Sequence, residues 1–414
     1  MLDIQRRISN TFYVLLSLPA TAMGFALSIQ IAALSWILGT QYGLDIHEIG
    51  IVWAAGPLAG ILGQVIIGII SDRVWFWGGR RRPFILIGGV LAALMLIALP
   101  NIHVISDQLG LGGILGVAIA VALTLDLAIN ISFNPTRSII ADVTEDGIPR
   151  TKGYTWMQTI SGFFGVAAYA LGATLGNYVL IYAGAVVVLL FSLLPPLFIE
   201  EPRVLSSAGT DPAENSRTQT DWGQLLRIYA AHAFSWLGIQ TMFVYIIAWI
   251  MQKLSPATDF ATGQIISISF LVLNTVGFIL PVTVLEPLSE RLGRVRVHTL
   301  AVAVMAAAYA MIVLFATSSM LLYVFMAFAG IGWAAVVSLP FAIMSENVDK
   351  SRMGFFMGIF NLSVVIPQLV VSLGLGLLIQ QTEDKALIFI IAAVSLGVSS
   401  LLWLLVREPG RIRT

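Results

Sequence analysis

The stretch LDLAINISFNPTRSIIAD, residues 125–142, places an acidic residue inside a long apolar run. Eighteen residues without a charge or a histidine precede Asp126, and ten such residues separate it from Arg137. If this run crosses a membrane, Asp126 lies near the bilayer midplane, where a charged side chain costs roughly 2.5–3.5 kcal/mol on insertion scales. An acid in that position points to a function, so the first question is whether the chain is a membrane protein.

Composition places the chain among membrane proteins. Of its 414 residues, 58% are hydrophobic and 11% are charged, whereas soluble domains carry about 25% charged residues. The absence of cysteine excludes disulfides, thiolate metal sites and cysteine catalysis. A formal net charge of zero gives no general attraction to nucleic acid.

Apolar runs bounded by polar, glycine or proline clusters predict an all-α membrane protein with twelve transmembrane helices. With twelve spans, 19 of the 22 Lys and Arg residues fall on one side of the membrane, Arg137 lies at a span end, and only Lys253 and Lys385 fall on the other side. This bias predicts that both termini are cytoplasmic. We expect a six-helix half over residues 1–199, a cytoplasmic linker over 200–224 and a second six-helix half over 225–414.

Short motifs indicate that the two halves are pseudo-symmetric repeats. An acid and an arginine, then a glycine and further basic residues, follow predicted span 2 and again predicted span 8. A Glu-Pro pair follows both span 6 and span 12. The residues concerned are Gly68, Asp72, Arg73, Gly79, Arg80 and Arg81 against Glu290, Arg291, Gly293 and Arg294, and Glu201-Pro202 against Glu408-Pro409. Duplicated halves with a midplane site are the architecture of alternating-access carriers.

The motif after span 2 resembles the loop 2–3 motif of the major facilitator superfamily. Four extra residues separate Asp72-Arg73 from Gly79-Arg80-Arg81, and this longer spacing is similar to that of sucrose/proton symporters within the glycoside–cation symporter group. The likeness continues in the segments around Gln30, Asp126, Ser338-Leu-Pro340 and Asn361–Gln368. One departure is Ile129, which stands where the plant members carry the first of two asparagines, and it leaves the identity of the sugar open.

Asp126 is the predicted proton carrier and also a candidate sugar ligand, because a sugar hydroxyl can bond to its carboxylate. It lies four residues from Asn130 and eleven from Arg137, so the three side chains share one helix face. Burial favours the neutral form of a carboxyl group, and protonation then permits a conformational switch. Arg137 lies about 16 Å along the helix axis from Asp126, with Pro135 between them, so direct contact requires bending or a bridge. The resemblance implies that Arg137 is a charge partner during the cycle. The alternative for Asp126 is a structural hydrogen bond between helices.

Amide side chains in several spans are candidate sugar ligands, because sugar hydroxyls need paired donors and acceptors. Trp333 is a candidate aromatic contact. The alternative is that these groups join helices, at ~0.6 kcal/mol each. The candidate amides are Gln30, Gln64, Asn130, Gln158, Gln240, Asn274, Asn361 and Gln368.

The charged motifs at the span ends have a different predicted role. The resemblance implies that they form a cytoplasmic latch that holds one conformation and breaks on switching. The alternative is that they only set topology through the positive-inside rule. The candidate latch residues are Asp72, Arg73, Arg80, Arg81, Glu290 and Arg291.

The sequence therefore predicts a proton-coupled sugar symporter, with an α-glucoside disaccharide such as sucrose or maltose as substrate. A sodium-coupled or uncoupled carrier, an exporter and a non-transporting sugar sensor stay open as alternatives. A membrane enzyme is disfavoured, because no convergent nucleophile and base or metal-binding group stands in the spans. We expect a monomer in the inner or plasma membrane that needs no metal or cofactor and binds no nucleic acid.

Overall fold

A computed structural model describes residues 9–60, 67, 70–71, 74–110, 113–144, 148–201, 221–345, 347 and 353–408. The regular elements in these ranges are helices, and the β pairing in these ranges is confined to an isolated bridge between Phe76 and Gly79. The chain divides into two compact units. The first comprises residues 1–44 and 51–211, and the second comprises residues 45–50 and 212–414.

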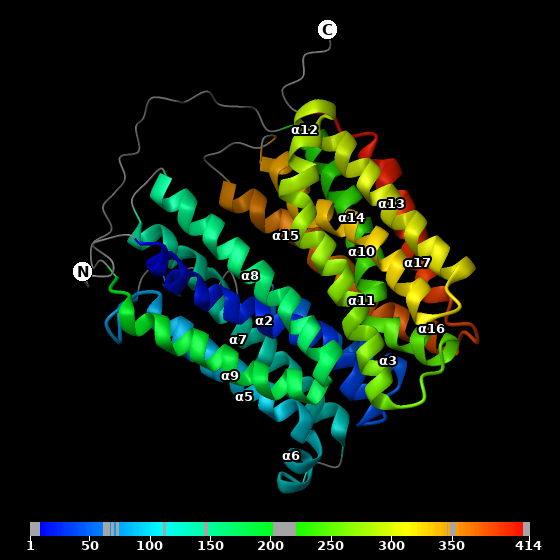
Figure 1. Cartoon of the computed structure of the whole chain (residues 1–414), viewed down its shortest axis with the longest axis horizontal. Coiled ribbons are helices and arrows are strands. Elements are labelled where there is room, and N and C mark those ends of the chain that lie inside the picture. Colours follow the sequence, from blue (N-terminus) through cyan, green and yellow to red (C-terminus); the bar gives the residue numbers. More distant parts are fainter. Residues whose placement is uncertain are drawn as a thin grey trace. The chain divides into compact units, whose positions relative to one another are not determined.

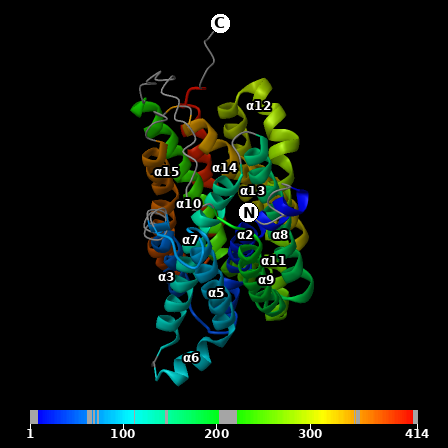
Figure 2. The ribbon, with the colours of Figure 1, turned by 90° about the vertical axis from the view of Figure 1, so that its left-hand side faces the viewer.

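Among its described residues, the first unit has five long helices, which run side by side in Figure 1. Helix α2 packs along α8 and α9, while α5 packs along α7 and α9. A short 3-10 turn, Leu99–Asn101, joins α5 to the small helix α6, Ile102–Gln108, which extends beyond α5 in Figure 2. The long helices are α2 (Asn10–Thr40), α5 (Arg82–Ala98), α7 (Ile114–Val143), α8 (Ile148–Leu175) and α9 (Asn177–Phe198). Helix α3 (Ile46–Trp53) lies across the boundary of the two units in sequence.

In the second unit, as in the first, two long helices each pack along two others. Helix α10 packs along α17 and α15, and α14 packs along α13 and α11. Two π-helical turns, Pro281–Leu285 and Val370–Leu375, continue α11 and α15. The helices are α10 (Trp222–Lys253), α11 (Asp259–Leu280), α12 (Glu286–Leu292), α13 (Arg294–Phe315), α14 (Ser319–Ser345), α15 (Met353–Leu369), α16 (Gly376–Gln381) and α17 (Leu387–Trp403).

The apolar helices have the length and composition of membrane spans. In the part of the chain that the structure describes, nine helical segments are long and apolar enough to cross a bilayer. Predicted span 12 corresponds to the shorter apolar helix α17, and predicted span 2 lies partly outside the described residues. The all-α membrane fold is therefore confirmed, and the count of twelve helices stays a prediction.

The helices that open the two predicted halves begin in the same way. The Ser9 hydroxyl accepts the Phe12 N–H at the start of α2, and the Asp221 carboxylate accepts the Gln224 N–H at the start of α10. Such caps satisfy backbone donors that have no partner within a helix.

In each unit, a glutamate carboxylate accepts the backbone N–H groups at the start of one helix, α5 or α13. We call this arrangement a carboxylate clamp. Glu201 accepts the backbone N–H groups of Arg80, Arg81 and Arg82 at 2.7–2.8 Å, where α5 begins. Glu408 accepts those of Arg294 and Val295 at 2.7 and 2.9 Å, where α13 begins. A carboxylate is favourable at a helix N-terminus because the unpaired N–H groups and the helix dipole attract negative charge. The Glu-Pro motif of the sequence thus has the same structural role in both units.

Gly79 and Gly293 make these carboxylate clamps possible. A Cβ atom on Gly79 would lie 2.4 Å from the Glu201 carboxylate, and one on Gly293 would lie 2.7 Å from the Glu408 carboxylate. Gly293 also has φ +94°, which side chains other than glycine rarely adopt.

Candidate functional site

Asp126 is buried in the middle of α7 and has a specific partner. Its side chain is 4% exposed, and so is that of Gln30 on α2. The Gln30 Nε2 group donates a hydrogen bond of 3.0 Å to Asp126 Oδ2. An amide donor satisfies this oxygen whether the carboxyl group is charged or neutral, because the oxygen is an acceptor in both states. The contact therefore holds the acid in place without fixing its charge.

Asn130 and Gly56 are the other two residues that lie close to Asp126. Asn130 Nδ2 donates to the backbone oxygen of Asp126 at 2.8 Å, so this bond runs along the helix and does not reach the carboxyl group. A Cβ atom added to Gly56 would lie 3.4 Å from both Asp126 carboxylate oxygens. Asn130 and Asp126 therefore share a buried region, as the four-residue spacing predicts, and Gly56 borders it.

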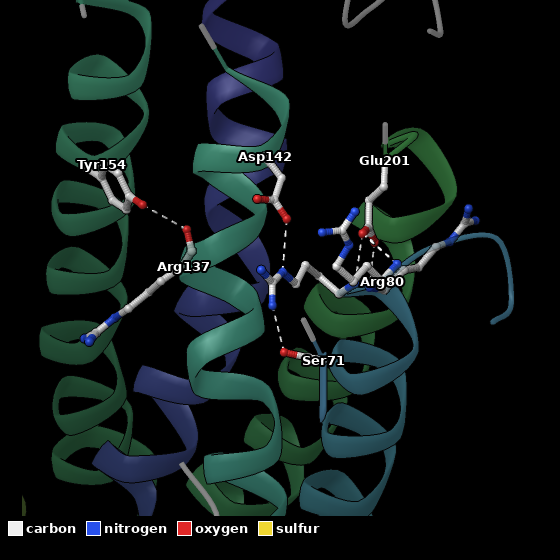
Figure 3. A network of polar contacts seen from close by, with 8 residues as sticks. Ser71, Arg80, Arg137, Asp142, Tyr154 and Glu201 are labelled. Atoms are coloured by element: carbon white, nitrogen blue, oxygen red, sulfur yellow. Dashed lines mark hydrogen bonds and ion pairs between the residues drawn. The ribbon is translucent and has the colours of Figure 1, made fainter. Parts of the chain in front are cut away.

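Arg137 stands apart from Asp126. Its guanidinium carbon lies 4.2 Å from the centre of the Phe133 ring, and its backbone oxygen accepts a 3.2 Å hydrogen bond from the Tyr154 hydroxyl. Figure 3 shows the Arg137 side chain pointing away from Asp142. Among the described residues, no ion pair joins Arg137 to Asp126, in keeping with their separation by three helical turns.

A buried ion pair connects the start of α5 with the end of α7. Arg81 Nε donates to Asp142 Oδ2 at 3.0 Å, and Arg81 Nη1 donates to Ser71 Oγ at 2.7 Å (Figure 3). The Arg81 side chain is 8% exposed and that of Asp142 is 10% exposed. Removing one partner of such a pair leaves a buried charge without compensation, which is strongly destabilising. Asp142 belongs to the segment that carries the family likeness, but sequence reasoning gave it no role.

Two amides meet in the second unit. Gln368 Nε2 on α15 donates to Gln240 Oε1 on α10 at 3.2 Å. An amide carries both donors and acceptor sites, so a single bond between two amides leaves hydrogen-bonding capacity on each. The structure thus brings together two of the candidate sugar ligands that the sequence placed in different spans.

Trp333 on α14 lies among aromatic and polar side chains of the same unit. Its Nε1 donates to Asn274 Oδ1 on α11 at 3.2 Å. Its ring centre lies 5.4 Å from Phe243 and 6.0 Å from Trp236, both on α10. Trp236 Nε1 in turn donates to His232 Nε2 at 3.0 Å. Sequence reasoning named Trp333 but missed Trp236, and an aromatic residue in an apolar span gives no signal that separates the two.

For the other predicted site residues, the structure shows their exposure or a backbone contact but no contact with another predicted ligand. Gln158 is exposed on α8, and Asn361 is half-buried on α15. Arg80 contributes its backbone N–H to the Glu201 clamp, while Glu290 and Arg291 are exposed on α12. Three predicted residues lie outside the described part of the chain: Gln64, Asp72 and Arg73.

One curated relative matches the chain over most of its length, and another matches about a third of it. It is 24% identical to the sucrose transport protein SUC4 of Arabidopsis thaliana over 428 residues, which cover 88% of this chain and 83% of that protein. A general alpha-glucoside permease of Schizosaccharomyces pombe is 35% identical over 144 residues, covering 32% of this chain and 26% of the permease. These matches confirm the predicted resemblance to the sucrose/proton symporters.

Solved structures and a family model identify the fold. A D-xylose-proton symporter matches with a TM-score of 0.72 at 14% identity, covering 97% of this chain and 99% of that chain. The nucleoside transporter NupG matches with a TM-score of 0.70 at 14% identity, covering 96% and 99%. The model of the Major Facilitator Superfamily matches residues 16–369 and 228–414. The chain therefore belongs to the Major Facilitator Superfamily, a family of multi-pass membrane transporters and not of enzymes.

Proposed function

We propose that this protein is a secondary active transporter that carries a sugar together with a proton by alternating access. The sugar is an α-glucoside disaccharide. The observation that carries the proposal is the buried Asp126 carboxyl group, held by one neutral amide in a transporter of this family. The sucrose transport proteins and the alpha-glucoside permease among the relatives support the substrate class.

Asp126 binds the proton in this proposal. A buried carboxyl group that is bonded to one amide gains a proton without losing the Gln30 hydrogen bond, because the bonded oxygen stays an acceptor. Protonation removes a charge that is costly at the bilayer midplane, so the protonated protein is the form that changes conformation. The exposed Arg137 is the proposed charge partner of the empty, deprotonated carrier in part of the cycle.

The sugar binds through amides and aromatic rings. Gln30 and Asn130 lie beside the acid in the first unit. In the second unit Gln240 and Gln368 are bonded to each other, and Trp333 packs against Phe243 of the helix that carries Gln240. Gln64, Gln158 and Asn361 complete the proposed set. Amide groups suit sugars because each presents a donor and an acceptor to vicinal hydroxyls.

The charged clusters at the helix ends form the proposed latch, with both termini on the cytoplasmic side of the inner or plasma membrane. The Arg81–Asp142 ion pair and the Glu201 clamp are within the first unit, and in this proposal they hold the start of α5, with Arg81 as one of the latch residues. Asp72, Arg73, Arg80, Glu290 and Arg291 are the remaining latch residues. The proposed halves are residues 1–199 and 225–414, joined by a linker over 200–224, and the proposed working form is a monomer.

The test is sugar uptake by proteoliposomes with and without an inward proton gradient. We expect a labelled α-glucoside disaccharide to accumulate above its external concentration only when the gradient is present. Dependence on sodium in place of protons would establish the sodium-coupled alternative. Equilibration without accumulation in either gradient would establish an uncoupled carrier, and the absence of flux with every mono- and disaccharide tried would contradict the proposal.

A further inference from the structure

A short insertion precedes α5 and has no counterpart before α13. Between the acid–arginine pair and the glycine of each repeated motif, the first half carries five residues, VWFWG at 74–78, before Gly79. The second half carries Leu292 alone before Gly293. Carboxylate clamps hold the starts of both helices, so the four extra residues are not needed to build a clamp. We call residues 74–79 the aromatic hairpin.

The backbone of the aromatic hairpin forms a tight turn that does not suit its first central residue. Phe76 and Gly79 exchange backbone hydrogen bonds of 3.1 and 3.2 Å. The two residues between them, Trp77 and Gly78, have φ +50° and +76°. Two-residue hairpin turns with positive φ at both positions favour Asn, Asp or Gly, and a tryptophan in this conformation is strained. The turn itself therefore does not explain why a tryptophan stands at its tip.

The aromatic side chains of the hairpin divide into an anchor and an exposed tip. The centre of the Phe76 ring lies 5.8 Å from that of Phe84, a buried residue of α5, and the two planes make an angle of 79°. The Trp77 side chain is 65% exposed and that of Trp75 is 36% exposed. Phe76 therefore fixes the hairpin to α5, while both indoles keep accessible ring surface.

The aromatic hairpin lies where two apolar spans end. Helix α5 is one such span and begins at Arg82, three residues after Gly79. Helix α9 is another and ends at Phe198, whose exposed side chain belongs to the apolar surface of that helix. Glu201 follows three residues later and accepts the backbone N–H group of Arg80. The clamp thus brings the ends of both spans to the hairpin, which puts the indoles at the level of the membrane surface.

An arginine beside the turn supplies a positive charge. A Cβ atom on Gly78 would lie 3.7 Å from Arg82 Nη1, so the guanidinium group borders the turn. The Glu201 carboxylate accepts the Arg82 backbone N–H at 2.7 Å and those of the two preceding residues, so its charge is directed at the helix start. Tryptophans are enriched at the membrane–water interface, and an arginine near the surface attracts anionic lipids. The hairpin therefore combines ring surface for acyl chains with a cation for a phosphate group.

We infer that the aromatic hairpin is a membrane anchor, in which Trp75 and Trp77 insert into the interface of the bilayer and Arg82 binds the headgroup of an anionic phospholipid. In the orientation proposed above, this lipid belongs to the cytoplasmic leaflet. The anchor holds the start of α5, with its clamp and the Arg81–Asp142 ion pair, at a fixed depth in the membrane. The inference goes beyond the proposed transport of a sugar, because it concerns the lipid and does not depend on the substrate.

Tryptophan fluorescence in lipid nanodiscs, where both membrane faces are accessible, tests the insertion. Phosphatidylcholine brominated in the upper part of its acyl chains quenches indoles at the interface, whereas iodide quenches indoles in water. The signal of Trp77 is the difference in emission between the wild type and Trp77→Phe, which keeps an apolar ring. We expect the brominated lipid to remove most of this signal and iodide to leave it unchanged.

The other outcomes of this measurement overturn the inference. Quenching by iodide alone would place the hairpin in water. Quenching by neither agent would show that protein covers it, either another part of this chain or a second copy. Trp403→Phe is the matched control, because the fully buried Trp403 ends α17 close to the Glu408 clamp, and its signal should respond to neither agent. Trp75→Phe gives an independent reading at the same hairpin, so a misfolded Trp77 variant does not decide the result.

The role of Arg82 is tested with brominated lipids of different headgroup. We expect brominated phosphatidylglycerol to quench Trp77 at about a fivefold lower mole fraction than brominated phosphatidylcholine, the order of the attraction of one arginine to an anionic surface. Arg82→Gln keeps the backbone N–H that Glu201 accepts, and it should abolish this preference while the zwitterionic lipid still quenches Trp77. Arg296→Gln, at an exposed arginine in the first turn of α13, should leave the preference unchanged. Equal quenching by both lipids in the wild type, or a preference that survives Arg82→Gln, would overturn the assignment of Arg82.

Discussion

The two units bury their polar groups in contrasting ways. The first unit holds one acid, Asp126, against the amide of Gln30. In the second unit, the corresponding interior contacts among described residues are neutral: the Gln240–Gln368 amide pair and the indoles bonded to Asn274 and His232. At the helix ends, by contrast, the units agree, because Glu201 and Glu408 clamp α5 and α13 in the same way.

This difference matches the two chemical tasks that we propose for the protein, which are proton binding and sugar recognition. A group that gains and loses charge must be an acid or base in a poorly solvated place, and such groups are expensive in a membrane. A group that recognises a neutral sugar needs amides and ring faces, which carry no charge penalty. A duplicated fold can therefore keep the same helix clamps in both halves, while the polar side chains in the interior differ between the halves.

The largest effect is expected from Asp126→Asn. The amide is nearly the same size and keeps an oxygen that accepts the Gln30 hydrogen bond, but it cannot exchange a proton with solvent at neutral pH. We expect accumulation driven by the proton gradient to fall to the level of the control without a gradient, while sugar exchange across the membrane at equal pH persists. Full gradient-driven accumulation by the variant would show that the coupling group lies elsewhere, and the division of tasks between the units would fail.

Two glutamine substitutions compare the interiors directly. Gln30→Leu leaves the buried Asp126 oxygen without its donor, so we expect a loss of about 1–3 kcal/mol of stability. Gln240→Leu leaves the half-buried Gln368 amide, which water can still reach, and the expected loss is below about 1 kcal/mol. Thermal unfolding in detergent micelles measures both. A larger loss for Gln240→Leu would reverse the ranking of the two units.

The helix clamps offer a matched pair of substitutions. We expect Glu201→Ala and Glu408→Ala each to cost about 1–2 kcal/mol of stability, the range for a lost helix cap. Glu201 accepts three backbone N–H groups and Glu408 accepts two, so the first substitution has the larger effect. Denaturant titration of the two variants beside the wild type checks this. A negligible effect at one of the two sites would break the structural equivalence of the units.

The smallest effect is expected at the exposed ion pair of Lys253 and Asp384, which are 2.7 Å apart. The hydrogen bond from Lys253 lowers the pKa of Asp384 below its ordinary value of 3.8. The folded state therefore favours the charged acid, and the resulting stabilisation is complete at neutral pH and is lost as the pH falls through the lowered pKa. Because the Asp384 side chain is 61% exposed, the contribution is below about 0.5 kcal/mol.

Asp384→Asn provides the measurement for this ion pair. We expect its unfolding temperature to lie slightly below that of the wild type at pH 7, and the difference to shrink as the pH falls below 3.8. A difference that does not shrink would mean that the ion pair is not its origin. In that case the small effect at the exposed Asp384 could not be compared with the large effect expected at the buried Asp126.

Local patterns predicted several features of the site. The spacing of Asp126 and Asn130 predicts a shared helix face, and the spacing of eleven positions from Asp126 to Arg137 predicts their separation along the helix. The structure contains both features. The sequence did not predict which residues from distant positions form hydrogen bonds or ion pairs with each other. Gln30 and Asp126 are 96 positions apart, and Arg81 and Asp142 are 61 apart. Such pairs depend on how α2, α5 and α7 pack, which a single helix period does not encode.

The sequence by itself determined the membrane class, the family and the identity of the one deeply placed acid. These follow from composition and from motifs that act locally, since hydrophobicity and helix ends are properties of short segments. Only the tertiary structure decided which amide meets Asp126, that the Glu-Pro motifs clamp helix starts, and that the indole N–H groups of Trp236 and Trp333 are bonded within the protein. Hydrogen bonds require groups within about 3 Å, and only the packing of helices fixes positions that closely.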